Sequence, residues 1–165
     1  AMTLLTVVAS RLELPLEPVP VTGQVMVVLL AGALLGPRWG VASQALFLLM
    51  GAAGAPVFAG RKAGPMVLAG TTGGYLVGFP LAALLAGLAA DWAVRRGSWV
   101  PLAAGCVAGV VAILGLGSLW LAGITGSATA AFSTGFAPFL GFDLIKAALA
   151  TLLAWPLLRG RCAQG

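Results

Sequence analysis

Residues 100–121 read VPLAAGCVAGVVAILGLGSLWL. This stretch carries no charged side chain and is long enough for a transmembrane helix, which needs about 20 mostly apolar residues. The rest of the chain has the same character, because 61% of its 165 residues are hydrophobic, only 8% are charged, and the mean hydropathy is +1.08. The sequence therefore predicts an all-α membrane protein with a single transmembrane domain over residues 1–165.

Glycine, proline and charged residues divide the chain into six apolar segments. The expected segments are residues 1–14, about 21–35, 41–53, about 75 to between 91 and 96, about 100–121, and 139–158. A stretch rich in Gly, Ser, Thr and Ala, residues 122–135, connects the fifth segment to the sixth. We expect a six-transmembrane-helix bundle with short loops.

Basic residues between the segments predict the orientation, because loops rich in Lys and Arg stay in the cytoplasm. One side of the predicted bundle receives Arg38, Arg95, Arg96, Arg159 and Arg161, and the other side receives Arg11, Arg61 and Lys62. This bias favours both termini in the cytoplasm. The loops before the second, fourth and sixth segments then face outward.

Two charged residues, Asp143 and Lys146, lie well inside an apolar segment. Their spacing of three residues places them on one face of a helix, near its predicted outer end. A charged side chain at such a depth costs about 2.5 to 3.5 kcal/mol on insertion scales, so it is usually paired or faces a cavity. The two residues either neutralise each other or offer an acceptor and a donor to one polar ligand, and we favour the ligand.

Other polar residues collect near the same predicted outer side. They are Thr22 and Gln24 at the start of the second segment, after Pro18-Val19-Pro20, Thr72, Gly74 and Tyr75 at the start of the fourth, and Arg61 in the preceding loop. Glycine permits close backbone approach, and tyrosine offers a ring with a polar tip. Arg61 could meet a ligand carboxylate. Gln44, in the third segment, is a further candidate, or it bonds a neighbouring helix.

Several function classes are excluded or disfavoured. The chain has no histidine and only four acidic residues, so a Ser-His dyad or a histidine metal site is absent, and the acids are too dispersed for a metal cage. It has no Gly-x-x-x-x-Gly-Lys-Ser/Thr loop for ATP phosphates. The net charge of +5 is scattered at segment ends, which does not indicate nucleic acid. We expect neither an enzyme nor a cofactor.

Small residues at four-residue spacing, such as Gly32, Gly36 and Gly40, let helix backbones touch. Packing within one bundle surrounded by membrane lipid is favoured over a homo-oligomer interface, which is the alternative.

Five blocks together resemble the BioY family of biotin-binding S components of energy-coupling-factor (ECF) transporters. They are residues 20–24 (PVTGQ), 30–38 (LAGALLGPR), 51–58 (GAAGAPVF), 72–79 (TGGYLVGF) and 143–146 (DLIK), in this order. The Thr-Gly-Gly-Tyr and Asp-x-x-Lys blocks are the specific ones. The chain departs from the S-component pattern Ala-x-x-x-Ala on the first helix, since Leu5 stands four residues before Ala9.

The resemblance implies an S component that binds biotin near the outer face and passes it inward with a coupling subunit and two ATPase subunits. It implies that Asp143 and Lys146 bind the polar ring of biotin, which is cargo and not a cofactor, and that Tyr75 and neighbouring loop residues close the pocket. The alternative is a structural or assembly membrane protein in which the Asp-Lys pair only neutralises itself.

Overall fold

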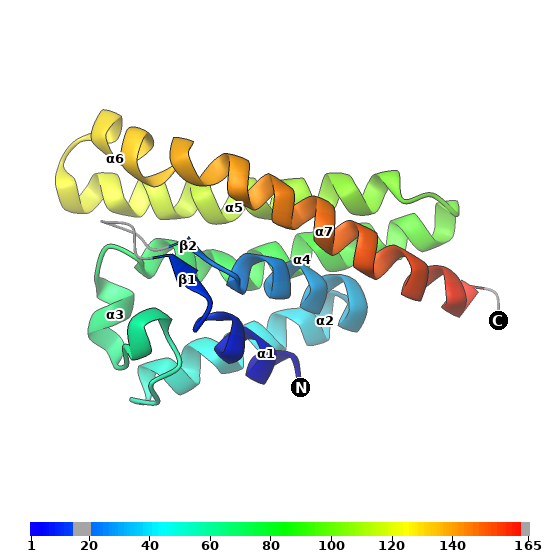
Figure 1. Ribbon diagram of the computed structural model, residues 1–165, viewed down its shortest axis with the longest axis horizontal. Helices are drawn as coiled ribbons and strands as arrows, with labels where there is room; N and C mark the ends of the chain where they lie inside the picture. The colour runs from blue at the N-terminus through cyan, green and yellow to red at the C-terminus, as the bar shows by residue number, and fades with distance from the viewer. Residues whose placement is uncertain (15–20, 163–165) are drawn as a thin grey trace.

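The computed structural model describes residues 1–14 and 21–162, and these residues form an almost entirely helical protein (Figure 1). The predicted all-α fold is confirmed. The elements in chain order are α1 (Met2–Ala9), β1 (Glu13–Leu14), β2 (Val21–Thr22), α2 (Gln24–Ala52), the 3-10 turn η1 (Ala59–Arg61), α3 (Pro65–Ala69), α4 (Gly73–Arg96), α5 (Val100–Thr125), α6 (Ala128–Gly135) and α7 (Ala137–Cys162). Among the described residues, four helices are long and apolar enough to cross a membrane, namely α2, α4, α5 and α7.

Helix α4 lies at the centre of the molecule, between α2 and α5 (Figure 1). Within its most apolar 18-residue stretch 61% is buried, against 39% for α2, 39% for α5 and 33% for α7. Small residues allow this central position, because Gly78 faces the Ile113 Cα of α5 so closely that an added Cβ would stand 2.9 Å from it. The outer helices keep one face exposed, as expected for a bundle whose surroundings are lipid.

Helix α2 is two helical arms that meet at a sharp break. Gly36 has φ 80° and ψ 172°, a conformation that only glycine adopts readily, and the extended ψ is the one that Pro37 imposes on the residue before it. The second arm folds back along the first, because an added Cβ on Gly40 would lie 2.7 Å from the Gly32 Cα. The sequence predicted two segments that end and restart around Gly36-Pro37, and the backbone breaks at this position.

The first predicted segment, residues 1–14, is helical only as far as Ala9. Beyond that residue the chain is held by polar contacts with the loop after α2. The Ser10 hydroxyl donates to the Val57 carbonyl (2.9 Å), the Arg11 guanidinium donates to the carbonyls of Pro56 and Phe58, and the Gly60 amide donates to Glu13 Oε2 (2.8 Å). The backbone itself ends α1 in a tighter turn, in which the Ser10 amide still donates to the Thr6 carbonyl and the Arg11 amide to the Val8 carbonyl. The side-chain contacts hold the chain after this turn against the loop, so α1 is one short helix.

Three short elements differ from the prediction: β1 and β2 lie within the first and second predicted apolar segments, and α6 lies where the sequence suggested a connection. Strand β1 pairs antiparallel with β2, with Glu13 opposite Thr22. Helix α6 forms within the stretch 122–135, and its N-cap is Ser127, whose hydroxyl accepts from the Ala130 amide (3.2 Å). Helix α6 packs on α5 and leads directly into α7.

Candidate substrate-binding site

Asp143 and Lys146 form an ion pair on α7. Lys146 Nζ lies 2.6 Å from Asp143 Oδ1, and only 4% of the Asp143 surface is exposed. The three-residue spacing predicted this shared face, and the structure confirms the pairing. At such burial each charge depends on its partner, because an unpaired buried ion keeps a large desolvation cost.

Residues from the start of α2 complete a polar cluster with this pair. Lys146 Nζ also donates to the Thr22 carbonyl oxygen (2.7 Å), a contact between positions 124 residues apart in the chain. The Thr22 hydroxyl donates to Gln24 Oε1 (3.1 Å). Thr22, Gln24, Asp143 and Lys146 are therefore together, as the sequence predicted; the preceding residues Pro18–Pro20 lie outside the described residues.

The Gln24 side chain has an unused donor. It is 2% exposed, and its Nε2 has no hydrogen-bond partner among the residues that the structure describes. A buried amide N–H without a partner costs about 1 to 3 kcal/mol, so such a group in a folded protein calls for an explanation. A bound ligand with a carbonyl oxygen would supply the missing acceptor.

Tyr75, on α4, contacts α7 about one helical turn before Asp143. Its hydroxyl donates to the Gly135 carbonyl (2.8 Å), and its ring lies 6.5 Å, centroid to centroid, from the ring of Phe139. Phe139 precedes Asp143 by four residues, so both lie on one face of α7. Tyr75 thus ties α4 to the α6–α7 junction and forms an aromatic wall with Phe139.

The Thr72-Gly73-Gly74 block serves the contact between α4 and α5. Thr72 is the N-cap residue of α4 and is half-buried, and its carbonyl accepts from the Leu76 amide (3.2 Å). Gly74 leaves room for the Trp120 side chain and the Leu116 carbonyl, which a Cβ would approach to 2.6 Å. The close approach expected of this glycine is therefore to α5.

Arg61 is exposed in η1, apart from the four-residue cluster. The neighbouring Gly60 nevertheless connects η1 to the cluster. Its amide donates to the Glu13 carboxylate of β1, β1 pairs with β2, and the Thr22 carbonyl of β2 accepts from Lys146. The η1 turn is thus built onto the same strand pair as the cluster.

Gln44 lies in the contact between α1 and the second arm of α2. Its Nε2 donates to Thr6 Oγ1 (3.3 Å) and to Ser43 Oγ (3.2 Å), and its side chain is fully buried. Its hydrogen bonds join two helices, which is the second of the two roles expected from the sequence.

Comparison with known proteins assigns the chain to a family. Residues 1–161 match the BioY family. The chain belongs to the BioY family. It is 43% identical over 152 residues to "Biotin transporter BioY" of Thermotoga maritima, covering 92% of this chain and 88% of that one. It is 39% identical over 150 residues to "Probable biotin transporter BioY" of Pyrococcus horikoshii, covering 91% and 87%.

A solved structure described as the S-component for biotin from an ECF-type ABC transporter has the same fold. Its TM-score is 0.88 at 27% sequence identity, covering 96% of this chain and 87% of that one. BioY proteins are transporters, so this chain is not an enzyme. Together with its apolar helices, the family makes it a multi-pass protein of the cell membrane.

Two members of the candidate site were not predicted from the sequence. The Thr22 group that binds Lys146 is a main-chain carbonyl, and every residue has one, so no residue type marks it. Phe139 stands among other apolar residues, and its place beside Tyr75 depends on how α4 meets α7. The spacing of Phe139 and Asp143, one turn apart, is the only signal that could have suggested it.

Proposed function

We propose that this chain captures biotin from outside the cell as the substrate-binding S component of an ECF transporter. The observation that carries the proposal is the cluster of Asp143, Lys146 and the unpaired Gln24 amide in a chain that belongs to the BioY family. The relatives are named as biotin transporters, and the structural neighbour as the S-component for biotin.

The chemistry of the cluster suits the ureido ring of biotin. That ring has two N–H donors and one carbonyl acceptor. In our proposal the N–H groups donate to the Asp143 carboxylate, and the carbonyl accepts from Gln24 Nε2 and from Lys146 Nζ. The ring carbonyl then supplies the acceptor that Gln24 Nε2 lacks among the described residues, and the ring N–H groups share the Asp143 carboxylate with Lys146.

The apolar part of biotin would lie against the aromatic wall of Tyr75 and Phe139. Thr72 and Gly74 set the position of Tyr75 by starting α4 and holding it to α5. Arg61, exposed in η1, is placed to attract the carboxylate at the end of the biotin chain. Thr22 orients both Gln24 and Lys146.

The topology we propose has six crossings with both termini in the cytoplasm. The crossings are the first segment, of which the 8-residue α1 covers only about 12 Å, the two arms of α2, α4, α5 and α7. The break at Gly36 supports two crossings in α2, and the distribution of basic residues supports the orientation. The β1–β2 pair, η1 and α6 then lie outside with the cluster.

Transport against a gradient requires an energy source from other subunits, because the sequence has no phosphate-binding loop. We propose a coupling subunit and ATPase subunits as partners, with the bundle surrounded by lipid. A homo-oligomer is the alternative assembly.

Isothermal titration of the purified chain with biotin tests this function. We expect saturable binding well below about 10 μM. Thiamine, a vitamin without a ureido ring, is the negative control and should release no binding heat. Absence of biotin binding at tens of micromolar, or equal binding of thiamine, contradicts the proposal.

A further inference from the structure

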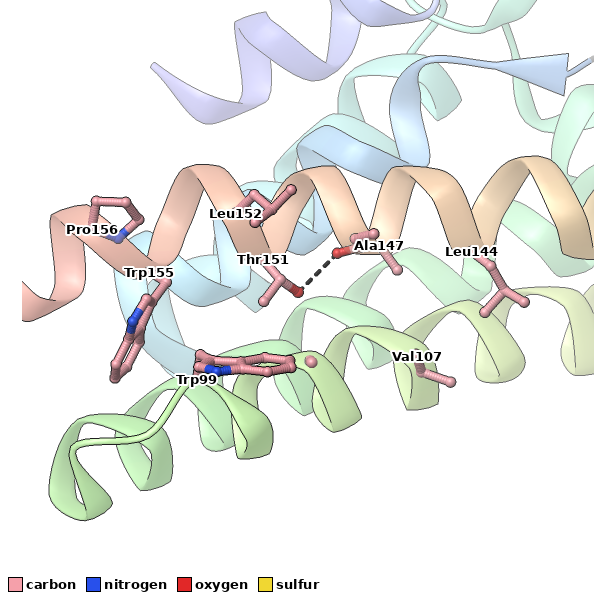
Figure 2. A pocket seen from close by; sticks show the side chains of 10 residues that line it. Trp99, Val107, Leu144, Ala147, Thr151, Leu152, Trp155 and Pro156 are labelled. Atoms are coloured by element: carbon pink, nitrogen blue, oxygen red, sulfur yellow. Dashed lines mark hydrogen bonds between the residues drawn. The ribbon is translucent and has the colours of Figure 1, made fainter.

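An apolar cavity lies between α5 and α7. Its lining residues Leu144 and Ala147 directly follow Asp143 and Lys146 of the polar cluster in the sequence of α7. Its volume is about 460 Å³. Both helices contribute to its walls, and the residues that define its length and ends include Trp99, Val107, Leu144, Ala148, Trp155 and Pro156 (Figure 2). The cavity is a half-open groove on the outer surface of the bundle.

The walls of the groove are almost entirely apolar. No charged side chain lines it, and its one hydroxyl, on Thr151, donates to the Ala147 carbonyl of its own helix (2.8 Å; Figure 2). In a membrane protein such a groove opens toward lipid tails.

The length of the groove matches one lipid chain. Leu144 and Pro156 are twelve residues apart on α7, which corresponds to about 18 Å at 1.5 Å per residue. The hydrocarbon core of a bilayer is about 30 Å thick, so the chains of one leaflet extend over about 15 Å. An extended acyl chain therefore fills the groove along its length.

One end of the groove is aromatic and basic. Trp99 and Trp155 stand together there (Figure 2), and tryptophan is enriched at the level of lipid head groups. The Arg159 guanidinium lies 5.9 Å from the Trp155 ring, whereas the Arg96 guanidinium lies 4.6 Å from the ring of Trp92, which does not line the groove. Among the described residues neither arginine forms an ion pair, and both are exposed.

We infer that the α5–α7 groove binds one acyl chain of an anionic phospholipid, with the phosphate head group at Arg159. The apolar walls accept the chain, and the Arg159 guanidinium, which forms no ion pair among the described residues, complements the negative head group. This end of the groove is the cytoplasmic one in the proposed orientation, and the cytoplasmic leaflet is the one that carries anionic lipids.

Native mass spectrometry of the purified full chain tests this site, using phosphatidylglycerol and phosphatidylcholine with identical acyl chains as probes. We expect retained phosphatidylglycerol in preference to phosphatidylcholine. Ala148→Phe, which fills the groove, should remove most of the retained phosphatidylglycerol. Arg159→Gln, which removes the head-group partner, should lower the occupancy roughly fivefold, the effect expected of one basic residue near an anionic surface.

The matched controls are Ala104→Phe, at an exposed alanine of α5 outside the groove, and Arg61→Gln, at an exposed arginine of η1. Both should keep the parent's occupancy. Equal retention of the two lipids, or equal losses in the controls and the groove variants, overturns the inference. A dimer peak that Ala148→Phe abolishes also overturns it, because a second copy of the chain would then occupy the groove.

Discussion

The Asp143–Lys146 pair is the most consequential pair of side chains in the membrane-spanning part of the protein. Lys146 Nζ lies 2.6 Å from Asp143 Oδ1 and also donates to the Thr22 carbonyl oxygen at 2.7 Å. A pair this well enclosed is sensitive to loss of either partner and tolerant of the loss of both, because only the single change leaves a lone charge.

We expect Asp143→Asn and Lys146→Met each to abolish biotin binding and to lower stability by about 3 kcal/mol. The stability loss follows from the charge that each variant leaves unpaired in a largely buried site. Thermal melting in detergent without ligand, and titration with biotin, measure the two effects separately. A single variant that binds biotin as the parent does would remove that residue from the site.

Gln24 and Gln44 are both buried glutamines of α2, and each Oε1 accepts from a threonine hydroxyl, of Thr22 and Thr6 respectively. They differ at Nε2, which lacks a partner among the described residues in Gln24 and donates to Thr6 and Ser43 in Gln44. Gln24→Leu should weaken biotin binding about tenfold, the value of one lost hydrogen bond, and should lower the melting temperature without ligand less than Gln44→Leu does, because it also removes an unsatisfied buried donor.

Gln44→Leu is the matched control and should affect stability rather than binding. It leaves the Thr6 hydroxyl without its glutamine partner, so the melting temperature should fall while biotin affinity stays. If both variants change stability and binding alike, the two glutamines do not differ in role.

At the scale of elements, the break in α2 decides where the polar cluster can form. The first arm of α2 carries Gln24 toward α7, and the second arm returns along it because Gly36 and Pro37 end one helix and begin another. This break was predictable from sequence, since the Gly-Pro pair is a strong local signal.

Gly36→Ala should destabilise the protein by about 1 to 3 kcal/mol. The cost is one of backbone conformation alone, because φ is 80° and an added Cβ would meet nothing within 4 Å. Gly115→Ala, inside α5 and also free of contacts within 4 Å, should instead stabilise by up to about 1 kcal/mol. Comparing the two melting temperatures checks the proposed cause; equal shifts of the same sign would contradict it.

Other elements could not be predicted from local sequence. The end of α1 at Ala9 depends on hydrogen bonds with residues 56–60, which are distant in the chain. Helix α6 lies in a stretch whose Gly, Ser and Thr content suggested a loop, although Ser127 is a recognisable N-cap residue. The pairing of β1 with β2 involves two residues on each side, too few to give a period.

At the scale of the whole molecule, membrane residence and helix class followed from composition, because apolar runs of this length have few other stable states. The polar cluster could be predicted only in part from the sequence. The orientation argument placed Thr22, Gln24, Asp143 and Lys146 on one side, and their mutual contacts are found. The different surroundings of Gln24 and Gln44 could not be predicted, because they depend on which helices become neighbours.

The orientation is tested by single cysteines introduced into a chain whose Cys106 and Cys162 have been replaced. We expect Arg61→Cys to react with an impermeant maleimide added to intact cells, and Arg95→Cys to react only after the membrane is opened. Labelling of position 95 from outside would contradict the proposed orientation and would place the proposed site at the cytoplasmic face.

Thermal melting with and without biotin, on the parent chain and on the double variant Asp143→Asn/Lys146→Met, tests the central claim most directly. The double variant removes both charges, so we expect it to melt near the parent temperature without ligand. Biotin at about 100 times its dissociation constant should stabilise the parent by about 2.7 kcal/mol and leave the double variant unchanged. A biotin-dependent rise in the double variant equal to that of the parent would contradict the assignment of Asp143 and Lys146 as the binding pair.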